Sequence, residues 1–593
     1  MTSPVSEQDA FGLVVVPDQP GLIEAIELLR PKWIGSDALA FERRWIEADG
    51  GHFDAVAKRI AFSTIEFATA QFAAQALDLS LAELFGAVEA PQSSSARGLD
   101  ADATIDYDQL AHPQALTQAC LANNAVAVRF SLHKVGGPQG LRRVLAVARA
   151  FNLAPIATLT SEAERSLATA LAAAFGFSIN DQSAAATPPA MRSKGSHQGA
   201  TIKCVRLRRV KVPLREVYVS AMYLTDHVLR TLIEIETADG TVGLGETLGG
   251  EDVFRLVATI AKGWIGASPI GANPFHRRML SRQYARIIYE NRNGRNGWQA
   301  LAGLDVACHD LIGKTLGLSV ASWLGHTAKE QSLRVVSLLP TAILDRVVPR
   351  EELRSVFADI GNTERVALHA LQLHREKGIT CFKYKSSGIG LEWDVAAIRA
   401  LREALGPAVE IRFDPNAAYD AATGLAICRA LEPYQLCWYE DPTDGIEGLA
   451  RLRAQLTRPI ATNMAVVQFD HLAPAVRQRA IDVALGDTLH WGGVEGMRDL
   501  ASACDALGIS LANHAFYECG IAAAVNLQVA IGLGLTHHAH DQAHDGLASD
   551  LLVGDPLAIR DGRITLPDGA GLGVMLDEQK VRAYQIGTPE ELH

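Results

Sequence analysis

Seven polar residues recur through the second half of the 593-residue chain, each inside or directly behind a short apolar run. They are Lys383, Lys385, Asp414, Glu440, Asn463, Asp487 and His514. From Lys385 onward, neighbours in this series are 23 to 29 residues apart, about the length of one strand–helix unit. Any one of them alone has an ordinary explanation, because an Asp before Pro-Asn often forms a turn and an Asn can cap a helix. A regular series at strand ends instead predicts one shared site.

Asp414, Glu440 and Asn463 offer only oxygen ligands, two of them anionic and one neutral. A hard divalent cation that keeps positions open for a substrate prefers such a set, and Mg²⁺ is the expected ion. Zinc would normally bring His or Cys into its ligand set. We therefore expect these three residues to bind Mg²⁺.

The stretch CFKYK places Lys383 and Lys385 on one face of a strand, because side chains alternate along it. A lysine with its ordinary pKa of ~10.4 is a poor base at neutral pH. A second ammonium and a nearby cation should lower that pKa, which makes Lys385 the expected general base. Asp487 and His514 form a second candidate base, with Asp487 orienting the imidazole. Two bases beside a divalent cation suit the removal of a proton next to a carboxylate.

The elements that must carry these residues are short apolar strands, which alternate with amphipathic helices from about Arg334 onward. VVSLLP, IRFDPN, CWYEDP and IATNM are each followed by a polar or helical segment, which predicts parallel βαβ units. Seven or eight such units predict a (β/α) barrel with its site at the carboxyl ends of the strands. Residues 201–328 differ: LRTLIEIETADGTVGLGE predicts an antiparallel pair, followed by helices.

The chain also partly repeats itself across an Ala/Pro/Ser/Gly-rich linker at 184–200. Residues 61–86 align without gaps with residues 300–325, and PIATLT from Pro155 recurs as PIATNM from Pro459. Upstream, the motifs WIG and FERR recur in the same order as WIG and FHRR. These matches predict an ancient internal duplication.

The first copy, residues 1–183, lacks the polar series. Arg129 and Ser131 stand where the second copy has its two lysines, and Leu159 stands where it has Asn463. No counterpart of the DPN or EDP strand lies between them. We therefore expect this region to be degenerate and non-catalytic.

Composition narrows the possible partners. The net charge is −12 and no basic run is present, which argues against nucleic acid and anionic membranes. The N-terminus lacks a signal-peptide pattern, and no apolar run approaches the ~18 residues of a membrane span. The eight cysteines show neither a CxxC pair nor a disulfide-like spacing, which is typical of a reduced cytoplasm. We expect a cytoplasmic homo-oligomer that acts on a small carboxylate.

The order KxK, Asp, Glu, Asn, Asp, His on successive strands resembles the enolase superfamily, specifically its glucarate dehydratase-like branch. The motifs GETLGGE, DPN, EDP, ATNM and GLGV extend the resemblance over about residues 201–580. It implies an α/β protein in which an α+β capping domain (201–328) covers a (β/α)7β TIM-like barrel (329–570). Residues 571–593 would return to the cap, and residues 1–183 would form a truncated enolase-like region.

The same resemblance implies Mg²⁺-dependent dehydration of an acid sugar such as an aldarate. Lys385 and His514 would act as bases, and Asp487 would orient His514. Asp414, Glu440 and Asn463 would hold the metal. The expected substrate contacts are Lys383, Asn416, Asn463 and His514.

Substrate recognition departs from the family pattern. The capping loop, roughly Val217–His227, has few polar groups, and Leu224 replaces a loop histidine. Ala515 and Phe516 replace a serine and an asparagine, and the C-terminal tail lacks an arginine that reads a distal carboxylate. These departures leave a 2-hydroxy-acid racemase or epimerase as an alternative, and the degenerate first copy leaves a non-catalytic scaffold as a third hypothesis.

Overall fold

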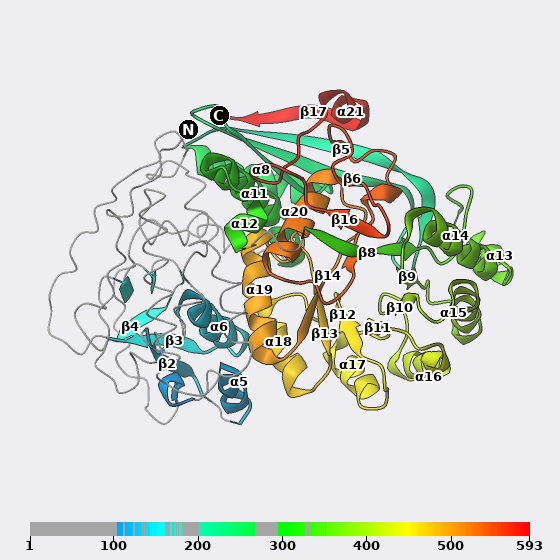
Figure 1. The fold of residues 1–593 in the computed structure, drawn as a ribbon, viewed down its shortest axis with the longest axis horizontal. Helices are drawn as coiled ribbons and strands as arrows, with labels where there is room; N and C mark the ends of the chain where they lie inside the picture. Colours follow the sequence, from blue (N-terminus) through cyan, green and yellow to red (C-terminus); the bar gives the residue numbers. More distant parts are fainter. Residues whose placement is uncertain are drawn as a thin grey trace.

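The computed structural model describes most of the chain from Thr104 onward, in three parts: an N-terminal sheet, a cap and a barrel (Figure 1). The described residues are 104–110, 113–122, 125–132, 134–135, 137–159, several between 167 and 180, 201–266, 294–325, 331–349 and 351–593. The predicted repeat at 61–86, its upstream motifs and the linker at 184–200 lie outside them. Within the described ranges, no helix combines the length and hydropathy needed to cross a bilayer.

Parallel strands form a nearly closed barrel in the order β14-β13-β12-β11-β10-β9-β8-β15. The strands are β8 (Ser332–Leu339), β9 (Cys381–Lys385), β10 (Glu410–Asp414), β11 (Tyr439–Glu440), β12 (Ile460–Thr462), β13 (Val483–Gly486), β14 (Ser510–Asn513) and β15 (His540–Asp541). The connecting helices are α13 (Leu353–Ala358), α14 (Asn362–Lys377), α15 (Leu391–Leu405), α16 (Ala421–Leu431), α17 (Gly445–Arg453), α18 (Phe469–Arg477), α19 (Gly493–Leu507) and α20 (Gly520–Gly532). A hydrogen bond of 3.2 Å from Asn513 Nδ2 to the Asp541 carbonyl bridges the seam between β14 and β15. The predicted (β/α)7β barrel is confirmed.

Strand β9 shows how two lysines can lie inside such a barrel. All five of its residues are buried. The Tyr384 hydroxyl points to the outer helices, where it accepts a hydrogen bond of 2.9 Å from Trp393 Nε1 of α15. Because side chains alternate along a strand, Lys383 and Lys385 face the barrel interior.

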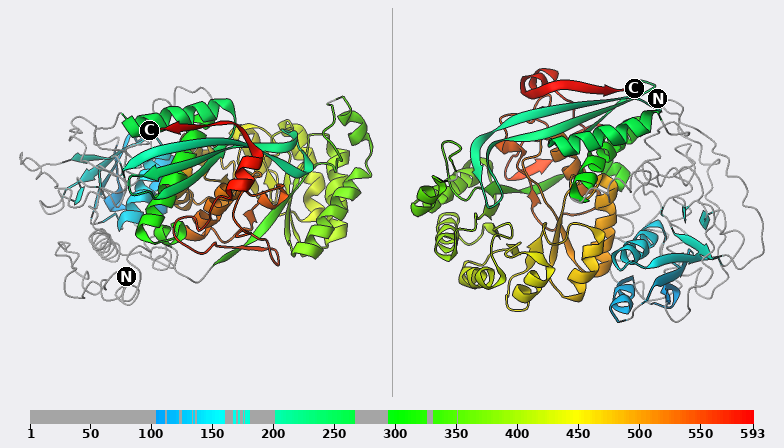
Figure 2. Two further views of the ribbon diagram at one scale, coloured as in Figure 1. Left: turned by 90° about the horizontal axis from the view of Figure 1, so that it is seen from above. Right: turned by 180° about the vertical axis from the view of Figure 1, so that it is seen from behind.

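The cap is an antiparallel sheet with helices packed on it, which confirms the predicted α+β capping domain. Its elements are β5 (Ile202–Val219), β6 (Leu224–Thr237), β7 (Val242–Leu248), α8 (Glu251–Gly266), α11 (Gly294–Leu316) and α12 (Val320–Leu324). After β16 (Arg563–Thr565) and α21 (Glu578–Tyr584), the chain ends in β17 (Gln585–Leu592), which pairs with β5. The long cap strands pass above the barrel (Figure 2, left). Strand β5 ends at Val219 and strand β6 begins at Leu224, so the loop between them is shorter than the predicted loop Val217–His227.

A buried ion pair joins the cap to the barrel. Glu246 of β7 accepts hydrogen bonds of 2.8 and 2.9 Å from the backbone N–H groups of Cys519 and Ala522 at the start of α20, where the helix dipole favours an anion. Arg230 of β6 lies 3.4 Å from Glu246 and donates to the Phe516 carbonyl at 2.7 Å. The cap therefore fixes the segment that follows His514.

The N-terminal sheet has parallel strands in the order β1-β2-β3-β4. Its elements are β1 (Thr104–Asp106), η2 (Tyr107–Gln109), α5 (Pro113–Ala122), β2 (Ala127–Ser131), α6 (Gly137–Ala150), β3 (Ala154–Thr158) and β4 (Ser178–Asn180). Helix α6 packs against α18 and α19 of the barrel (Figures 1 and 2). The buried Arg142 of α6 lies 3.2 Å from Asp499 and 3.6 Å from Glu495, both on α19. The duplication itself stays a prediction.

Candidate active site

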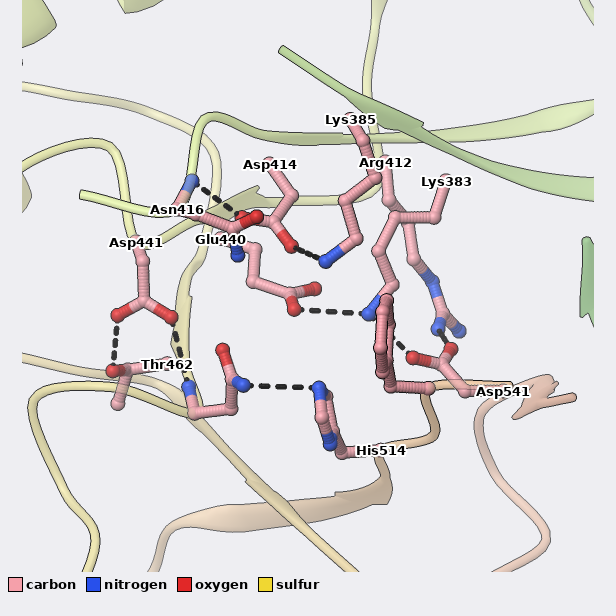
Figure 3. A network of polar contacts seen from close by, with 12 residues as sticks. Lys383, Lys385, Arg412, Asp414, Asn416, Glu440, Asp441, Thr462, His514 and Asp541 are labelled. Carbon is pink, nitrogen blue, oxygen red and sulfur yellow. Dashed lines mark hydrogen bonds and ion pairs between the residues drawn. The ribbon is translucent and has the colours of Figure 1, made fainter. Parts of the chain in front are cut away.

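The barrel brings the predicted polar series to one mouth, the end of the barrel at the carboxyl ends of the strands. Figure 3 shows five members of the series there: Lys383, Lys385, Asp414, Glu440 and His514. Lys385, Asp414 and Glu440 are the last residues of β9, β10 and β11. Asn463, Asp487 and His514 directly follow β12, β13 and β14. Parallel strands in one barrel present these ends side by side, so residues that are distant in sequence line one site.

The two lysines are held by carboxylates from neighbouring strands. Lys385 forms an ion pair with Asp414, and Lys383 lies 2.9 Å from Glu440. Burial opposes the ammonium charge of Lys385, but Asp414 and Glu440 outweigh it and raise the pKa of Lys385. The prediction was that a second ammonium and a nearby cation lower this pKa. Among the charges of the chain itself, the carboxylates outweigh the second ammonium, so that part of the prediction is wrong.

The pKa values of Asp414 and Glu440 shift in opposite directions. Burial and the nearby Glu440 raise the pKa of Asp414 to about 6. Burial also works against ionised Glu440, but Lys383 and Lys385 hold its pKa at about 2. Two buried carboxylates that repel each other at a barrel mouth form a site in which a cation is favourable.

Asn463 links these carboxylates to the candidate base. His514 Nδ1 lies 2.7 Å from Asp487 Oδ2, so Nδ1 carries the proton and Nε2 is left as an acceptor. The Asn463 amide nitrogen donates to Nε2 at 2.9 Å. Its Oδ1 is buried and has no hydrogen-bond partner among the described residues. A buried oxygen without a partner is costly, and together with Asp414 and Glu440 it completes an all-oxygen set that suits Mg²⁺.

Asp441 positions Asn463, a role that the sequence did not reveal. Its carboxylate accepts a hydrogen bond from the Thr462 hydroxyl and one of 2.9 Å from the Asn463 backbone N–H. Burial and the charge of Asp414 raise the pKa of Asp441 to about 8. In Figure 3 it points away from the lysines, toward Thr462. The motif EDP thus supplies a mouth residue and a positioning residue side by side.

Asn416, an expected substrate contact, lies at the same mouth. Its backbone N–H donates to Asp414 Oδ1 at 2.8 Å (Figure 3). Its φ of 49° is in the left-handed region that Asn tolerates better than most residues. The contact of its side chain with substrate stays a prediction.

Asp541 was also missed. It ends β15 and pairs with Lys383 on one side and with Arg412 Nη1 at 2.6 Å on the other. Arg412 is buried and stacks on the Trp438 ring at 3.9 Å. Asp541 lies one further strand–helix interval beyond His514, so the spacing of the series could have identified it.

His490 is a second histidine beside the candidate base. Its Nδ1 lies 2.8 Å from Asp487 Oδ2, the oxygen that also binds His514. Although burial opposes it, the imidazoles of His490 and His514 hold the pKa of the Asp487 carboxyl well below its usual range. The ligand atoms of these three residues lie within 4.8 Å of one another, but hydrogen bonds account for the arrangement.

A glycine pair fixes the loop that carries His490. Gly493 has a φ of 91°, and a Cβ there would lie 2.2 Å from Asp305 Oδ2 of α11. The same oxygen accepts a hydrogen bond of 2.7 Å from the Val494 N–H. Only glycine allows this close approach of the loop to the cap helix.

Family comparisons agree with this geometry. The model described as Mandelate racemase / muconate lactonizing enzyme, N-terminal domain, matches residues 203–325, and Enolase C-terminal domain-like matches residues 365–580. The crystal structure of an isomerase from Streptomyces coelicolor A3(2) is 32% identical, with a TM-score of 0.57, over 65% of this chain and 98% of that chain. The chain belongs to the enolase superfamily.

Other members of the enolase superfamily carry several activities. The Streptomyces coelicolor protein named "Probable glucarate dehydratase" is 29% identical over 59% of this chain and 83% of its own length. A crystal structure of an enolase from Thermobispora bispora with magnesium and formate is 30% identical, with a TM-score of 0.57, over 65% of this chain and 92% of that chain. More distant relatives, at 24 to 26% identity, are named as cycloisomerases, an epimerase and a further dehydratase.

Proposed function

We propose that the protein is a Mg²⁺-dependent acid-sugar dehydratase of the enolase superfamily. One observation carries the proposal: the oxygen set of Asp414, Glu440 and Asn463 lies between a lysine and an Asp–His pair, with Asn463 bonded to His514. The name of the glucarate dehydratase relative supports the reaction class. The relative crystallised with magnesium supports the ion.

The chain's own residues divide the reaction between them. Lys383 lies where it can bind one substrate carboxylate, and Lys385 takes the proton from the adjacent carbon. As the acid, His514 is the imidazolium, which carries a second proton on Nε2 besides the one on Nδ1 and gives the Nε2 proton to the departing β-hydroxyl, which leaves as water. The enol that remains tautomerises to a 2-keto-3-deoxy acid. Asp487 keeps the imidazole oriented throughout and stabilises its charged form.

Asp414, Glu440 and Asn463 would hold the ion. Bound there, Mg²⁺ would supply positive charge to stabilise the anion that forms when the α-proton is removed, and it would offset the carboxylates that raise the pKa of Lys385. Burial of Lys385 would then favour the neutral amine that a base requires.

A racemase or epimerase is the second candidate, and the cap loop favours it. Tyr223 stacks on Phe516 with ring centroids 4.7 Å apart, and Tyr218 contacts the same ring edge-on at 5.4 Å. The loop therefore meets the segment behind His514 through aromatic rings. An aromatic cover over the site suits a substrate acid with fewer hydroxyl groups. Two bases on opposite faces of such an acid could invert the stereocentre at its α-carbon.

The test is a screen of hexarates, pentarates and aldonates with Mg²⁺, followed for 2-keto-acid release and by proton NMR in D₂O. A dehydratase releases a 2-keto-3-deoxy acid from at least one of them. Solvent deuterium at the α-carbon with the hydroxyl retained would identify the racemase instead. If no acid gives either signal, both candidate functions are overturned.

A further inference from the structure

A second cavity lies beside the active site, where all three parts of the molecule meet. It encloses about 440 Å³, within the ~300–1,000 Å³ typical of small-molecule pockets. Arg149 and Asn152 of the N-terminal region line one side, and Trp298 of the cap helix α11 lines another. Phe469, the first residue of α18, and His490, in the loop behind β13, complete it. Both follow the carboxyl ends of strands, so the cavity lies on the mouth side of the barrel.

His490 lies in the wall between this cavity and the catalytic pair. A small space of about 10 Å³ is lined by Asp487, His514 and Asn463, and it shares Val467, His490 and Trp491 with the large cavity. The small space has room for about one water molecule. The ring centroids of His490 and His514 are 5.9 Å apart. A substrate that reaches from the catalytic pair into the large cavity therefore passes Val467, His490 and Trp491, the residues that line both spaces.

Arg149 has the geometry of an anion ligand. Its guanidinium lies over the Phe469 ring at 4.0 Å and faces the Trp298 ring at 5.9 Å. Such cation–π contacts use no N–H hydrogen bond of the guanidinium, so its N–H groups can still bind a carboxylate. Its ion pair with Asp499 is long, at 3.6 Å, and the side chain is 42% exposed. The charge is thus held in place yet accessible.

The remaining wall suits a hydroxylated chain. Gln468 donates to Asp470 at 3.0 Å, and both line the cavity together with Asn152. Amide and carboxylate oxygens accept hydrogen bonds from hydroxyl groups, and the aromatic rings offer apolar faces. Asp470 is the one acidic residue among the lining residues, so a wholly anionic ligand fits less well than a hydroxylated acid.

We propose that the N-terminal region completes the substrate site, with Arg149 binding the distal carboxylate of a dicarboxylic acid sugar. This inference rests on the proposed acid-sugar function and adds its substrate class. It also gives the otherwise non-catalytic region a role in specificity. The first carboxylate lies with Lys383 at the barrel mouth, and the second lies with Arg149.

The test compares Arg149→Ala with Arg143→Ala in the full-length protein with Mg²⁺. Arg143 lies on the same helix and pairs with Asp505 of α19, but it does not line the cavity, so its loss controls for weakened docking. Binding of D-glucarate and D-gluconate is measured by calorimetry, and kcat and KM are measured for the best hexarate of the screen and its aldonate.

We expect Arg149→Ala to weaken hexarate binding by about 10- to 100-fold, the effect of one charged hydrogen-bonded contact. The loss should fall on KM, leave the aldonate nearly unchanged and be partly restored in Arg149→Lys. Arg143→Ala should keep the wild-type preference. A wild-type protein without preference for hexarate over aldonate, or an Arg149→Ala variant that weakens both equally, overturns the inference. Selective binding of hexarates without turnover would instead uphold the inference and contradict the dehydratase proposal.

Discussion

The predicted duplication pairs strand β9 of the barrel with strand β2 of the N-terminal sheet, yet the two strands carry different polar residues. In β9, Lys383 and Lys385 are almost completely buried, and carboxylates on β10, β11 and β15 compensate their charges. In β2, the corresponding positions hold the half-buried Arg129 and the buried Ser131, whose backbone N–H donates to Asp108 at 2.9 Å. Buried ammonium groups are tolerated only where partners surround them. The barrel supplies carboxylates from β10, β11 and β15 and can keep two buried lysines, whereas β2 keeps its cation only half-buried and has a neutral residue at the fully buried position.

The two regions also direct their cations differently. In the barrel, Lys383 and Lys385 face the interior at the mouth. In the N-terminal region, the arginines of α6 face α19 of the barrel. Arg142, Arg143 and Arg149 all contact carboxylates on that helix. One region therefore uses cations for chemistry, and the other uses them for docking and, by our inference, for binding substrate.

The largest effect should come from the two bases. Lys385→Met and His514→Asn should each reduce dehydration by ~10²–10⁴-fold, the usual contribution of a general acid or base. If the bases lie on opposite faces of the acid, each variant should still exchange the α-proton of one epimer with D₂O, as followed by proton NMR. Loss of exchange with both epimers in both variants would contradict the two-base arrangement.

The second-largest effect should come from substitutions in the oxygen set of Asp414, Glu440 and Asn463. Glu440→Gln and Asn463→Ala should each weaken Mg²⁺ binding by ~10-fold or more, because each weakens or removes a ligand of a three-ligand set. Calorimetric titration measures the affinity. Glu410→Gln is a matched control, since Glu410 begins β10 at the far end of the barrel and pairs with Arg334 at 2.9 Å. Unaltered Mg²⁺ affinity in both site variants would show that these residues only balance the lysine charges.

Removing residues 1–195 separates the two regions directly. The shortened protein should keep α-proton exchange at saturating substrate near the wild-type rate, because the lysines, the oxygen set and the Asp–His pair all lie in the barrel. Its KM for hexarates should rise as in Arg149→Ala. A folded but wholly inactive product, checked by circular dichroism and gel filtration, would mean that the N-terminal region takes part in the chemistry.

The smallest effect concerns docking. Arg142→Ala leaves Asp499 and Glu495 without their buried partner and should reduce the free energy of unfolding by ~1–3 kcal/mol. Thermal unfolding and limited proteolysis of the N-terminal region measure it. Turnover of an aldonate should stay at the wild-type level. A protein whose unfolding and proteolysis are both unchanged would indicate that the apolar contacts of α6 alone hold the region.

Much of the barrel site was predictable, because each residue sits at a fixed place in a locally encoded unit. An apolar strand followed by a polar residue and a helix is readable within about 25 residues, and Asn463 and His514 were found this way. Asp541 escaped because β15 is only two residues long and its run of histidines hides the strand. His490 escaped because its contact with Asp487 depends on the glycine-stabilised loop rather than on strand spacing.

The sequence by itself determined which residues end the strands and in which order, since period and spacing are local properties. The tertiary structure alone decided which charges face one another. The pKa of Lys385 shifts upward rather than downward because the fold brings Asp414 of β10 and Glu440 of β11 close to it, and electrostatic interaction depends on distance in space. The same reason holds for Arg149: nothing near it in the chain distinguishes it from Arg143, and only the packing of α6 against the barrel and cap places its guanidinium beside Phe469 and Trp298.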